Sequence, residues 1–372
     1  MNYFSLFFKK CLLFGIFLII SNLLDAQISL CDSVDITSAS NSGNFNVDNY
    51  SENDGIRNGP DYFGSTIFYP KNTNHLLPSI IIIPGYANPE ASMQAWGPFL
   101  ASHGIVTMTI GTNNIFQYPN ARKDALLDAL ISIKQENSRA ASPLYNKLDV
   151  NKLALAGWSM GGGGAQLAAV EDSSLKAIVA LCPWLDPNTT NSSTVNHNIP
   201  IIFVSSELDA IAPPSSHADM QYQLTQSSTK KLIYEINNAG HTAANNPLNS
   251  QGDVGRMVLS WLKNYLEDDS CYCPLLLDIP NSASRHETNI NCQTNNISEN
   301  SIALILYPNP TKNIINIEAK SWINTEYKIL DLNGKIVYKG SINNDLIIDI
   351  SFLESNIYFI CLTNKYYKIL KI

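Results

Sequence analysis

Residues 152–170, with the sequence KLALAGWSMGGGGAQLAAV, decide the fold of this chain. The largely apolar run KLALA at the start predicts a buried strand, and AQLAAV at the end predicts a helix. Between them lies a G-x-S-x-G pentapeptide, residues 157–161, followed by three more glycines. Glycine tolerates the strained backbone of a sharp turn and leaves room for the adjacent strand and helix. The stretch therefore predicts a strand, a sharp turn and a helix, with Ser159 at the turn.

Strand, sharp turn and helix is the context in which a G-x-S-x-G serine acts as a nucleophile. The alternative is a glycine-rich turn that opens an ordinary helix, and the flanking segments favour the nucleophile. A serine hydroxyl is a weak nucleophile, so it needs a base and an acid that orients the base. In chains with this turn, the acid and then the base follow the serine, each just after a strand.

Two later segments supply such an acid and base. Residues 199–204 predict a strand, and the loop after it carries Asp209. Residues 231–236 predict the next strand, and His241 follows it. We therefore expect Ser159, Asp209 and His241 to form a catalytic triad in which His241 takes the serine proton.

Other acids and histidines are less well placed. Glu207 shares the acid loop and Asp186 follows the preceding strand, so both remain alternatives to Asp209. His217 follows Asp209 by only eight positions, which is too early for the base. The remaining histidines precede the acid or lie in a late loop: His75, His103, His197 and His286.

Attack on an ester carbonyl turns its oxygen into an oxyanion. N–H groups already positioned before the reaction stabilise this negative charge. One donor is the backbone of Met160, the residue after the nucleophile. The other comes from the loop after an earlier strand. Residues 80–83 predict that strand, and Pro84-Gly85-Tyr86 follows it, so we assign the second donor to Tyr86.

The segment from about residue 58 to 292 resembles the bacterial cutinase-type polyester hydrolases, which include poly(ethylene terephthalate) hydrolases. The matching pieces occur in the family's order, at residues 84–86, 96–104, 157–164, 183–184, 207–213 and 240–241. The resemblance implies an α/β-hydrolase fold, with a mostly parallel sheet covered by helices on both faces. It also implies a substrate cleft, to which we assign Tyr86, Trp158, Trp184, Ile211 and His217.

Two positions depart from common family patterns. Trp158 stands where many members carry His, although some carry Trp, and Gln221 stands where a bulky apolar residue is frequent beside the cleft. Fewer than twenty residues separate the strand ending near Leu181 from the strand starting at Ile199, so no lid domain fits there. An open cleft can admit a polymer chain. The expected activity is hydrolysis of polyesters and short-chain acyl esters, and the alternative is a general secreted carboxylesterase or triacylglycerol lipase without polymer activity.

The start of the chain predicts export. Lys9 and Lys10 precede an apolar run at residues 11–20, and Ala26 offers a small residue for cleavage. These features describe a secretory signal peptide, which we assign to residues 1–26. The apolar run is shorter than the roughly 20 residues that a spanning helix needs, so we expect no transmembrane segment after signal removal.

Export permits disulfide bonds, and six of the seven cysteines lie after residue 26. Cys182 and Cys361 lie in apolar strand-like runs, where we expect buried free thiols. The other four lie in polar segments and allow two bridges with three connectivities: Cys31, Cys271, Cys273 and Cys292. The family resemblance favours Cys273 with Cys292, which leaves Cys31 for Cys271. No C-x-x-C pair or histidine cluster indicates zinc, so we expect neither a metal nor another cofactor.

A second domain follows a change in composition. Residues 281–300 are rich in Asn, Ser and Thr, and we place a linker at 293–301. Residues 302–372 show short alternating strand patterns, with a hairpin turn expected at Asn333-Gly334. The Tyr-Pro-Asn-Pro run at 307–310 and the strand at 357–359 resemble the C-terminal sorting domain of the type IX secretion system of Bacteroidetes-type bacteria.

The second resemblance implies a small β-sandwich that the type IX secretion machinery recognises, and a product that is secreted or attached to the cell surface. Asn356 departs from it, because Gly is usual before the last strand. The alternative for residues 302–372 is a β-sandwich that binds substrate or cell wall.

Charge narrows the expected partners. The net charge is −8, and residues 302–372 carry +2, so the residues before them carry −10. An acidic catalytic region argues against nucleic acid or anionic lipid as a partner. We expect a monomer whose catalytic domain, residues 27–292, acts on a polyester or acyl ester. A catalytically silent surface-binding protein would require the triad geometry to fail.

Overall fold

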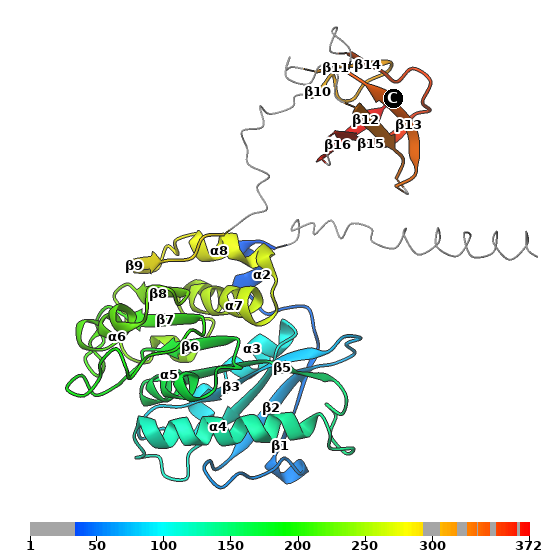
Figure 1. Cartoon of the computed structure of the whole chain (residues 1–372). Coiled ribbons are helices and arrows are strands. Elements are labelled where there is room, and N and C mark those ends of the chain that lie inside the picture. The colour runs from blue at the N-terminus through cyan, green and yellow to red at the C-terminus, as the bar shows by residue number, and fades with distance from the viewer. Residues whose placement is uncertain (1–33, 293–305, 318–325, 333, 343–346, 363–364) are drawn as a thin grey trace, which may run out of the picture. The chain divides into compact units, whose positions relative to one another are not determined.

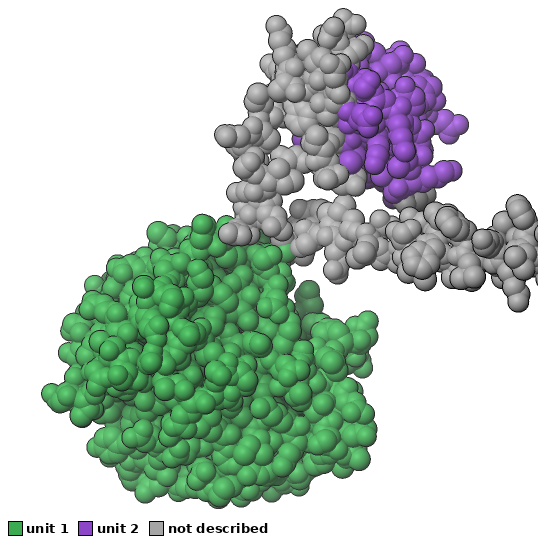
Figure 2. Space-filling view, in the orientation of Figure 1, with its two compact units in different colours: residues 1–292 green, residues 293–372 purple. Residues whose placement is uncertain are grey.

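The computed structural model describes residues 34–292, 306–317, 326–332, 334–342, 347–362 and 365–372. The chain divides into two units, residues 1–292 and residues 293–372, which Figure 2 colours separately. The signal peptide expected at residues 1–26 and the linker expected at 293–301 lie outside the described residues.

Unit 1 is built around one nine-stranded sheet, whose strand order is β1-β2-β4-β3-β5-β6-β7-β8-β9 (Figure 1). Strands β4, β3, β5, β6, β7 and β8 run parallel to one another, while β1, β2 and β9 add antiparallel edges. The strands are β1 Val47–Ser51, β2 Ser65–Pro70, β3 Leu77–Ile83, β4 Val106–Ile110, β5 Leu148–Trp158, β6 Ala177–Leu181, β7 Ile201–Ser206, β8 Lys231–Ile236 and β9 Ala283–Thr288.

Helices cover both faces of this sheet and bury two separate apolar cores. On one face lie α2 Ile36–Ser40, α3 Trp96–Ser102, α7 Asp253–Leu266 and α8 Cys273–Leu277. On the other lie α4 Pro119–Glu136, α5 Met160–Glu171 and α6 Ala218–Leu224. Short 3₁₀ turns are η2 Glu52–Asp54, η3 Glu90–Met93, η4 Pro214–Ser216, η5 Ala243–Asn245, η6 Ser250–Gly252 and η7 Ser270–Tyr272.

The central strands are apolar on both sides because helices cover both sides. Every residue of β3, β6 and β7 is buried, which is the near-continuous apolar pattern of a parallel sheet between two helix layers. The predicted strand at 231–236 coincides with β8, and those at 152–156 and 199–204 fall within or overlap β5 and β7. The α/β-hydrolase expectation is confirmed. Residues 182–200 between β6 and β7 form turns and bends without a helix or strand, so no lid occupies this connection.

The described cysteines follow the expected pattern, with Cys361 of unit 2 as the exception. Cys273 at the start of α8 is bonded to Cys292, as the family resemblance implied. The second expected bridge cannot be followed, because Cys31 lies outside the described residues. Cys182 is a buried free thiol, as expected, whereas Cys361 is free but only half-buried, because it lies on the outer face of its sheet.

Unit 2 is a small β-sandwich of a three-stranded and a four-stranded sheet, with orders β10-β11-β14 and β13-β12-β15-β16. Its core contains residues of both sheets, among them Ile315, Ile329 and Ile360. The predicted hairpin joins β12 to β13, with Gly334 at φ 77° in the turn. The strands are β10 Leu306–Tyr307, β11 Ile314–Ile317, β12 Glu326–Leu330, β13 Ile336–Ser341, β14 Ile347–Asp349, β15 Asn356–Leu362 and β16 Lys365–Lys371.

Candidate active site

Ser159 lies at the sharp turn between β5 and α5, with φ 56° and ψ −122°, a conformation that L-residues rarely adopt. The glycines around it leave space for the turn. A Cβ atom on Gly157 would come within 2.2 Å of the Gly161 backbone, and one on Gly161 within 2.5 Å of the Ile83 carbonyl oxygen. The G-x-S-x-G pattern is therefore a steric requirement of the way β5 turns into α5.

Backbone hydrogen bonds tie Ser159 to the next strand and to the loop beyond it. The Ser159 N–H donates to the Leu181 carbonyl at 2.8 Å, and the Ser159 carbonyl accepts from the Trp184 N–H at 2.8 Å. The position of Trp184 is thus fixed relative to the serine by a direct bond.

Asp209 and His241 lie together after β7 and β8. The Asp209 Oδ2 atom accepts a hydrogen bond from His241 Nδ1 at 2.6 Å. The Asp209 Oδ1 atom accepts from the N–H groups of Ile211 and Ala212, at 2.9 and 2.8 Å. Burial opposes ionisation of Asp209, but the bonds from His241 and the two N–H groups outweigh it and keep its pKa below the usual value. The carboxylate is charged at neutral pH and holds the imidazole in one orientation.

The alternative acids have other partners. Glu207 accepts a hydrogen bond from the Asn238 N–H at 2.8 Å, and Asp186 accepts from the N–H and the side-chain amide of Asn188. Among the three acids considered, Asp209 is the one hydrogen-bonded to His241.

The site residues converge on one cavity of about 280 Å³, which we call the Ser159 cavity. It is lined by Tyr86, Asn88, Trp158, Ser159, Met160, Trp184, Ile211 and His241. Of the residues predicted from sequence, His217 is absent from this lining, and Asp209 lies behind His241. Asn88 is an addition that the sequence did not indicate. It lies two residues after Tyr86, and its side-chain amide donates to the Tyr86 carbonyl at 2.8 Å.

Two comparisons with known proteins place this geometry in a family. Residues 33–297 match the family model described as PET hydrolase-like. The chain belongs to the PET hydrolase-like family. It is a carboxylic ester hydrolase, as are relatives named cutinase and bis(hydroxyethyl) terephthalate hydrolase.

Three of these relatives show the extent of the similarity. Cutinase est1 of Thermobifida alba is 36% identical over 240 residues, which is 64% of this chain and 76% of the relative. Cutinase 1 of Thermobifida cellulosilytica is 35% identical over 217 residues, 58% of this chain and 79% of the relative. Bis(hydroxyethyl) terephthalate hydrolase of Streptomyces coelicolor is 36% identical over 219 residues, 58% of this chain and 66% of the relative.

Unit 2 has its own match. Residues 305–372 match the family model described as secretion system C-terminal sorting domain. This domain marks the PET hydrolase-like unit for type IX secretion to the cell surface or beyond it. Among the described residues, no helix has both the length and the apolar character needed to cross a membrane.

The two positions that depart from common family patterns have different surroundings in this PET hydrolase-like chain. Trp158 lines the Ser159 cavity, and its Nε1–H donates to the His241 carbonyl at 2.8 Å, so it holds the backbone of the candidate base. Gln221 is fully buried and accepts from Gln166 at 2.6 Å, so it lies behind the cavity rather than beside it. His217 is also buried, and its ring lies 5.7 Å from that of Trp184. It therefore packs against Trp184 without lining the Ser159 cavity.

An aromatic loop that the sequence did not indicate packs against Tyr86, next to the Ser159 cavity. The rings of Phe116 and Tyr118 lie 5.5 and 6.0 Å from that of Tyr86, and both side chains are more than half exposed. Arg122 fixes the loop from inside, because its guanidinium donates to the carbonyls of Pro84, Ile115 and Gln117. Burial lowers the pKa of Arg122 to about 10, so it stays charged at neutral pH.

Cys182 lies directly behind the acid–base pair. Its Sγ atom and one ligand-type atom each of Asp209 and His241 lie within 4.8 Å of one another. Burial raises the pKa of the Cys182 thiol to about 12, so the thiol is neutral at neutral pH. Because a thiol binds metals as the thiolate and Asp209 already bonds His241, we assign no metal to this cluster.

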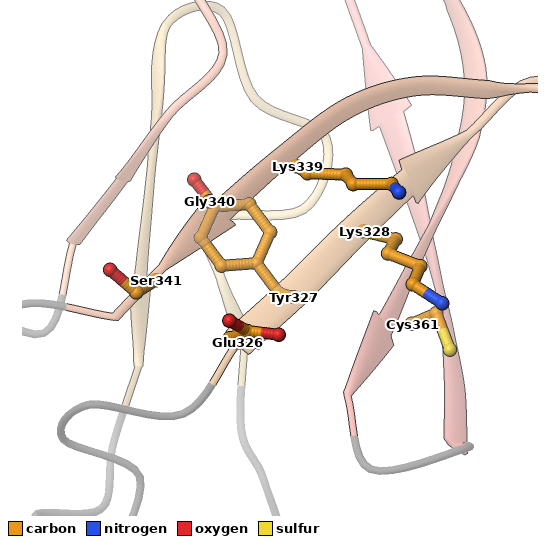
Figure 3. Close-up of a pocket in the computed structure, with 7 residues that line it drawn as sticks. All are labelled: Glu326, Tyr327, Lys328, Lys339, Gly340, Ser341 and Cys361. Atoms are coloured by element: carbon orange, nitrogen blue, oxygen red, sulfur yellow. The ribbon is translucent and has the colours of Figure 1, made fainter.

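A larger cavity, of about 640 Å³, lies in unit 2 (Figure 3). It is lined by Glu326, Tyr327, Lys328, Lys339, Gly340, Ser341 and Cys361, and we call it the lysine cavity. Lys328 lies opposite Lys339 on one side and Cys361 on the other, across three adjacent strands. No histidine is available there, since all six histidines of the chain lie in unit 1. The candidate active site is therefore the Ser159 cavity.

Proposed function

We propose that this protein cleaves polyesters, poly(ethylene terephthalate) included, and short-chain acyl esters through an acyl-enzyme formed on Ser159. The observation that carries the proposal is the 2.6 Å hydrogen bond from His241 to Asp209, with His241 and Ser159 both lining one cavity. The polyester assignment is supported by the family and by relatives named as cutinases and as a bis(hydroxyethyl) terephthalate hydrolase.

In the first step, the Ser159 Oγ atom attacks the ester carbonyl carbon and its proton passes to His241 Nε2. The carbonyl electron pair moves to oxygen, then returns as the bond to the alkoxy oxygen breaks. His241 gives its proton to that oxygen, and the alcohol leaves. Asp209, held by its two N–H donors, keeps Nδ1 of His241 protonated and stabilises the imidazolium. Water then repeats the sequence and releases the acid.

The oxyanion is assigned to the N–H groups of Met160 and Tyr86. Met160 is the first residue of α5, so its N–H has no acceptor within the helix. Within the described residues, no acceptor is found for the Tyr86 N–H either. Both residues line the Ser159 cavity, and two donors held in advance can stabilise a developing charge without reorganisation.

The aromatic walls favour a polymer with aromatic groups. Tyr86 and Trp184 line the cavity from two different loops, and Ile211 is 65% exposed at its edge. A ring placed between them gains stacking beyond plain burial, of roughly 0.5–1.5 kcal/mol. The absence of a lid between β6 and β7 leaves space for a chain that extends past the site.

The proposal is tested by incubating the secreted protein, in parallel, with polyester film, tributyrin and p-nitrophenyl butyrate. We expect soluble aromatic acid from the film and turnover of both small esters, all abolished in Ser159→Ala. Turnover of the small esters without attack on the film would establish the carboxylesterase or lipase alternative. No turnover of any of the three would establish a silent binding protein.

A further inference from the structure

A second cavity, of about 260 Å³, lies beside the Ser159 cavity and shares Trp184 with it. We call it the outer cavity. It lies between residues 118–120 and 184–194, with Leu167 of α5 contributing to its lining. An apolar cavity of about 150 Å³ accommodates benzene, so the outer cavity has room for an aromatic ring with its ester group.

A row of aromatic rings connects the two cavities. The Tyr118 ring lies 6.0 Å from that of Tyr86 and 6.2 Å from that of Trp184, in edge-to-face geometry on both sides. Tyr118 is 61% exposed and lines the outer cavity, whereas Tyr86 lines the Ser159 cavity. A large ring left open to solvent between two cavities is available to contact a ligand that spans both.

The row is held rigidly relative to Ser159. Tyr118 is the residue before α4, whose first residue is Pro119, and the carbonyl of its neighbour Gln117 accepts from buried Arg122. On the opposite side, the Trp184 N–H bonds the Ser159 carbonyl, and His217 bonds the Leu185 carbonyl at 3.0 Å. The outer cavity therefore stays at one position from the serine, as a binding site for part of a longer substrate requires.

The walls of the outer cavity match an aromatic ester. Leu167 and Leu185 supply apolar surface, and Thr194 supplies a half-buried hydroxyl. That hydroxyl accepts from the Asn191 N–H at 3.1 Å, and no acceptor for its own proton is found in the described part of the chain. It is free to donate to an ester carbonyl.

We propose that the outer cavity binds the repeat unit joined to the far end of the acyl group, so that the acyl side of a bound polyester carries two units. The inference rests on the proposed function, because it takes the acyl group to lie between Tyr86 and Trp184 against Ser159. Under this proposal, Tyr118 and Leu167 determine the specificity for substrate length, because they contact the second repeat unit. One-unit esters do not reach them.

The test uses the linear ester of two terephthalates and three ethylene glycols, in which each terephthalate has one terminal and one central ester. Cutting a terminal ester places the second terephthalate on the acyl side and yields ethylene glycol and a two-unit acid. Cutting a central ester leaves the outer cavity empty and yields two one-unit products. The ratio of two-unit acid to one-unit products, taken from the first few per cent of reaction, is independent of enzyme amount and stability.

Tyr118→Ala should lower this product ratio by about five- to tenfold through lost ring contact. It should change kcat/KM for bis(2-hydroxyethyl) terephthalate, which has one unit, by less than about twofold. Leu167→Trp should lower the ratio as well, because a larger side chain on α5 fills the outer cavity while Tyr118 itself is unchanged. Tyr118→Phe keeps the ring and should keep the ratio. Tyr145→Ala is the matched control, since Tyr145 is 45% exposed and lines neither cavity.

The proposal stands if Tyr118→Ala and Leu167→Trp both lower the ratio while Tyr145→Ala leaves it unchanged. An unchanged ratio in either variant overturns it, and so does an equal loss of kcat/KM on one-unit and two-unit esters. If the unmodified protein cleaves neither ester, the proposed function itself fails, which is a separate result from cleavage with an unaltered ratio.

Discussion

The Ser159 cavity and the lysine cavity differ in how the chain builds them. The Ser159 cavity is lined by residues that lie far apart in sequence, from Tyr86 to His241, each near the end of a strand in a parallel sheet. The lysine cavity is lined by side chains along three neighbouring antiparallel strands. It is the larger of the two, at about 640 against about 280 Å³.

Convergence, rather than volume, favours the Ser159 cavity as the candidate active site. At the carboxyl ends of parallel strands, loops from many parts of a chain meet and can present different groups to one point. Along antiparallel strands, the side chains of one face are directed the same way, and here they bring two lysines opposite each other. The four predictions that follow test this contrast, from the largest expected effect to the smallest.

The largest effect should come from the triad. Ser159→Ala or His241→Ala should each lower kcat/KM on p-nitrophenyl butyrate by at least about 10³-fold, because triad members act as a unit. Asp209→Asn should cost nearly as much, since it permits the wrong imidazole tautomer. Matched changes in the lysine cavity, Lys328→Ala and Cys361→Ser, should leave the rate unaltered. Near-normal turnover in Ser159→Ala or His241→Ala would remove the assignment of the site.

The second effect concerns the stability of the fold at acid pH. Burial lowers the pKa of His197 to about 4, whereas a histidine in an unfolded chain has a pKa of about 6.5. As the pH falls from about 6.5 to 4, the unfolded state takes up a proton that the folded state does not. The free energy of unfolding should therefore fall over this window, by about 3 kcal/mol from this group.

His197→Phe should remove that part of the acid dependence, as measured by urea unfolding of unit 1 at pH 7 and pH 4.5. The matched control is His75→Phe, the same change at an exposed position. Equal pH dependence in His197→Phe and the unmodified protein would contradict a neutral, buried His197.

The third effect concerns the aromatic wall. Trp184→Ala should lower the rate on aromatic polyester about tenfold, through lost stacking and lost apolar area. p-Nitrophenyl acetate barely reaches that wall, so its hydrolysis should change much less. Equal losses on both substrates, together with a lower melting temperature, would make Trp184 a packing residue instead of a cleft residue.

The smallest effect should follow removal of unit 2. A chain ending at Ser298 should keep full esterase activity after purification, because every residue assigned to the site lies in unit 1. The same chain should not be exported by a type IX-competent host, because it lacks the sorting domain. Activity lost on truncation would show that the two units do not work separately.

The site residues found from sequence are those marked by local patterns. The strained turn at Ser159 requires glycines, which mark it in the sequence. Asp209 and His241 each follow an apolar run that predicts a strand, and both runs are strands in the structure. Tyr86 and Met160 were also predicted from sequence, by their places after a strand and after Ser159. Both line the Ser159 cavity, and their oxyanion role stays a prediction.

Phe116 and Tyr118 could not be found in this way. They follow β4, and their meeting with Tyr86 depends on β4 pairing with β3, where Ile80 lies beside Thr107. That pairing is a long-range contact with no local signal. The half-buried Cys361 was misjudged for a related reason. An apolar run in a two-layer sandwich has one outer face, and sequence does not say which residues lie on it.

Arg122 links the two loops beside the cleft, and this link bears on how the site loses its structure on heating. One buried cation serves three carbonyls, and these belong to the Tyr86 loop on one side and the Phe116 loop on the other. If either loop opened alone, a charge would remain buried with too few acceptors, which is costly. Opening either loop alone is therefore opposed by the bonds of Arg122 to both. On warming, the temperature at which activity is lost should therefore coincide with the melting temperature of unit 1.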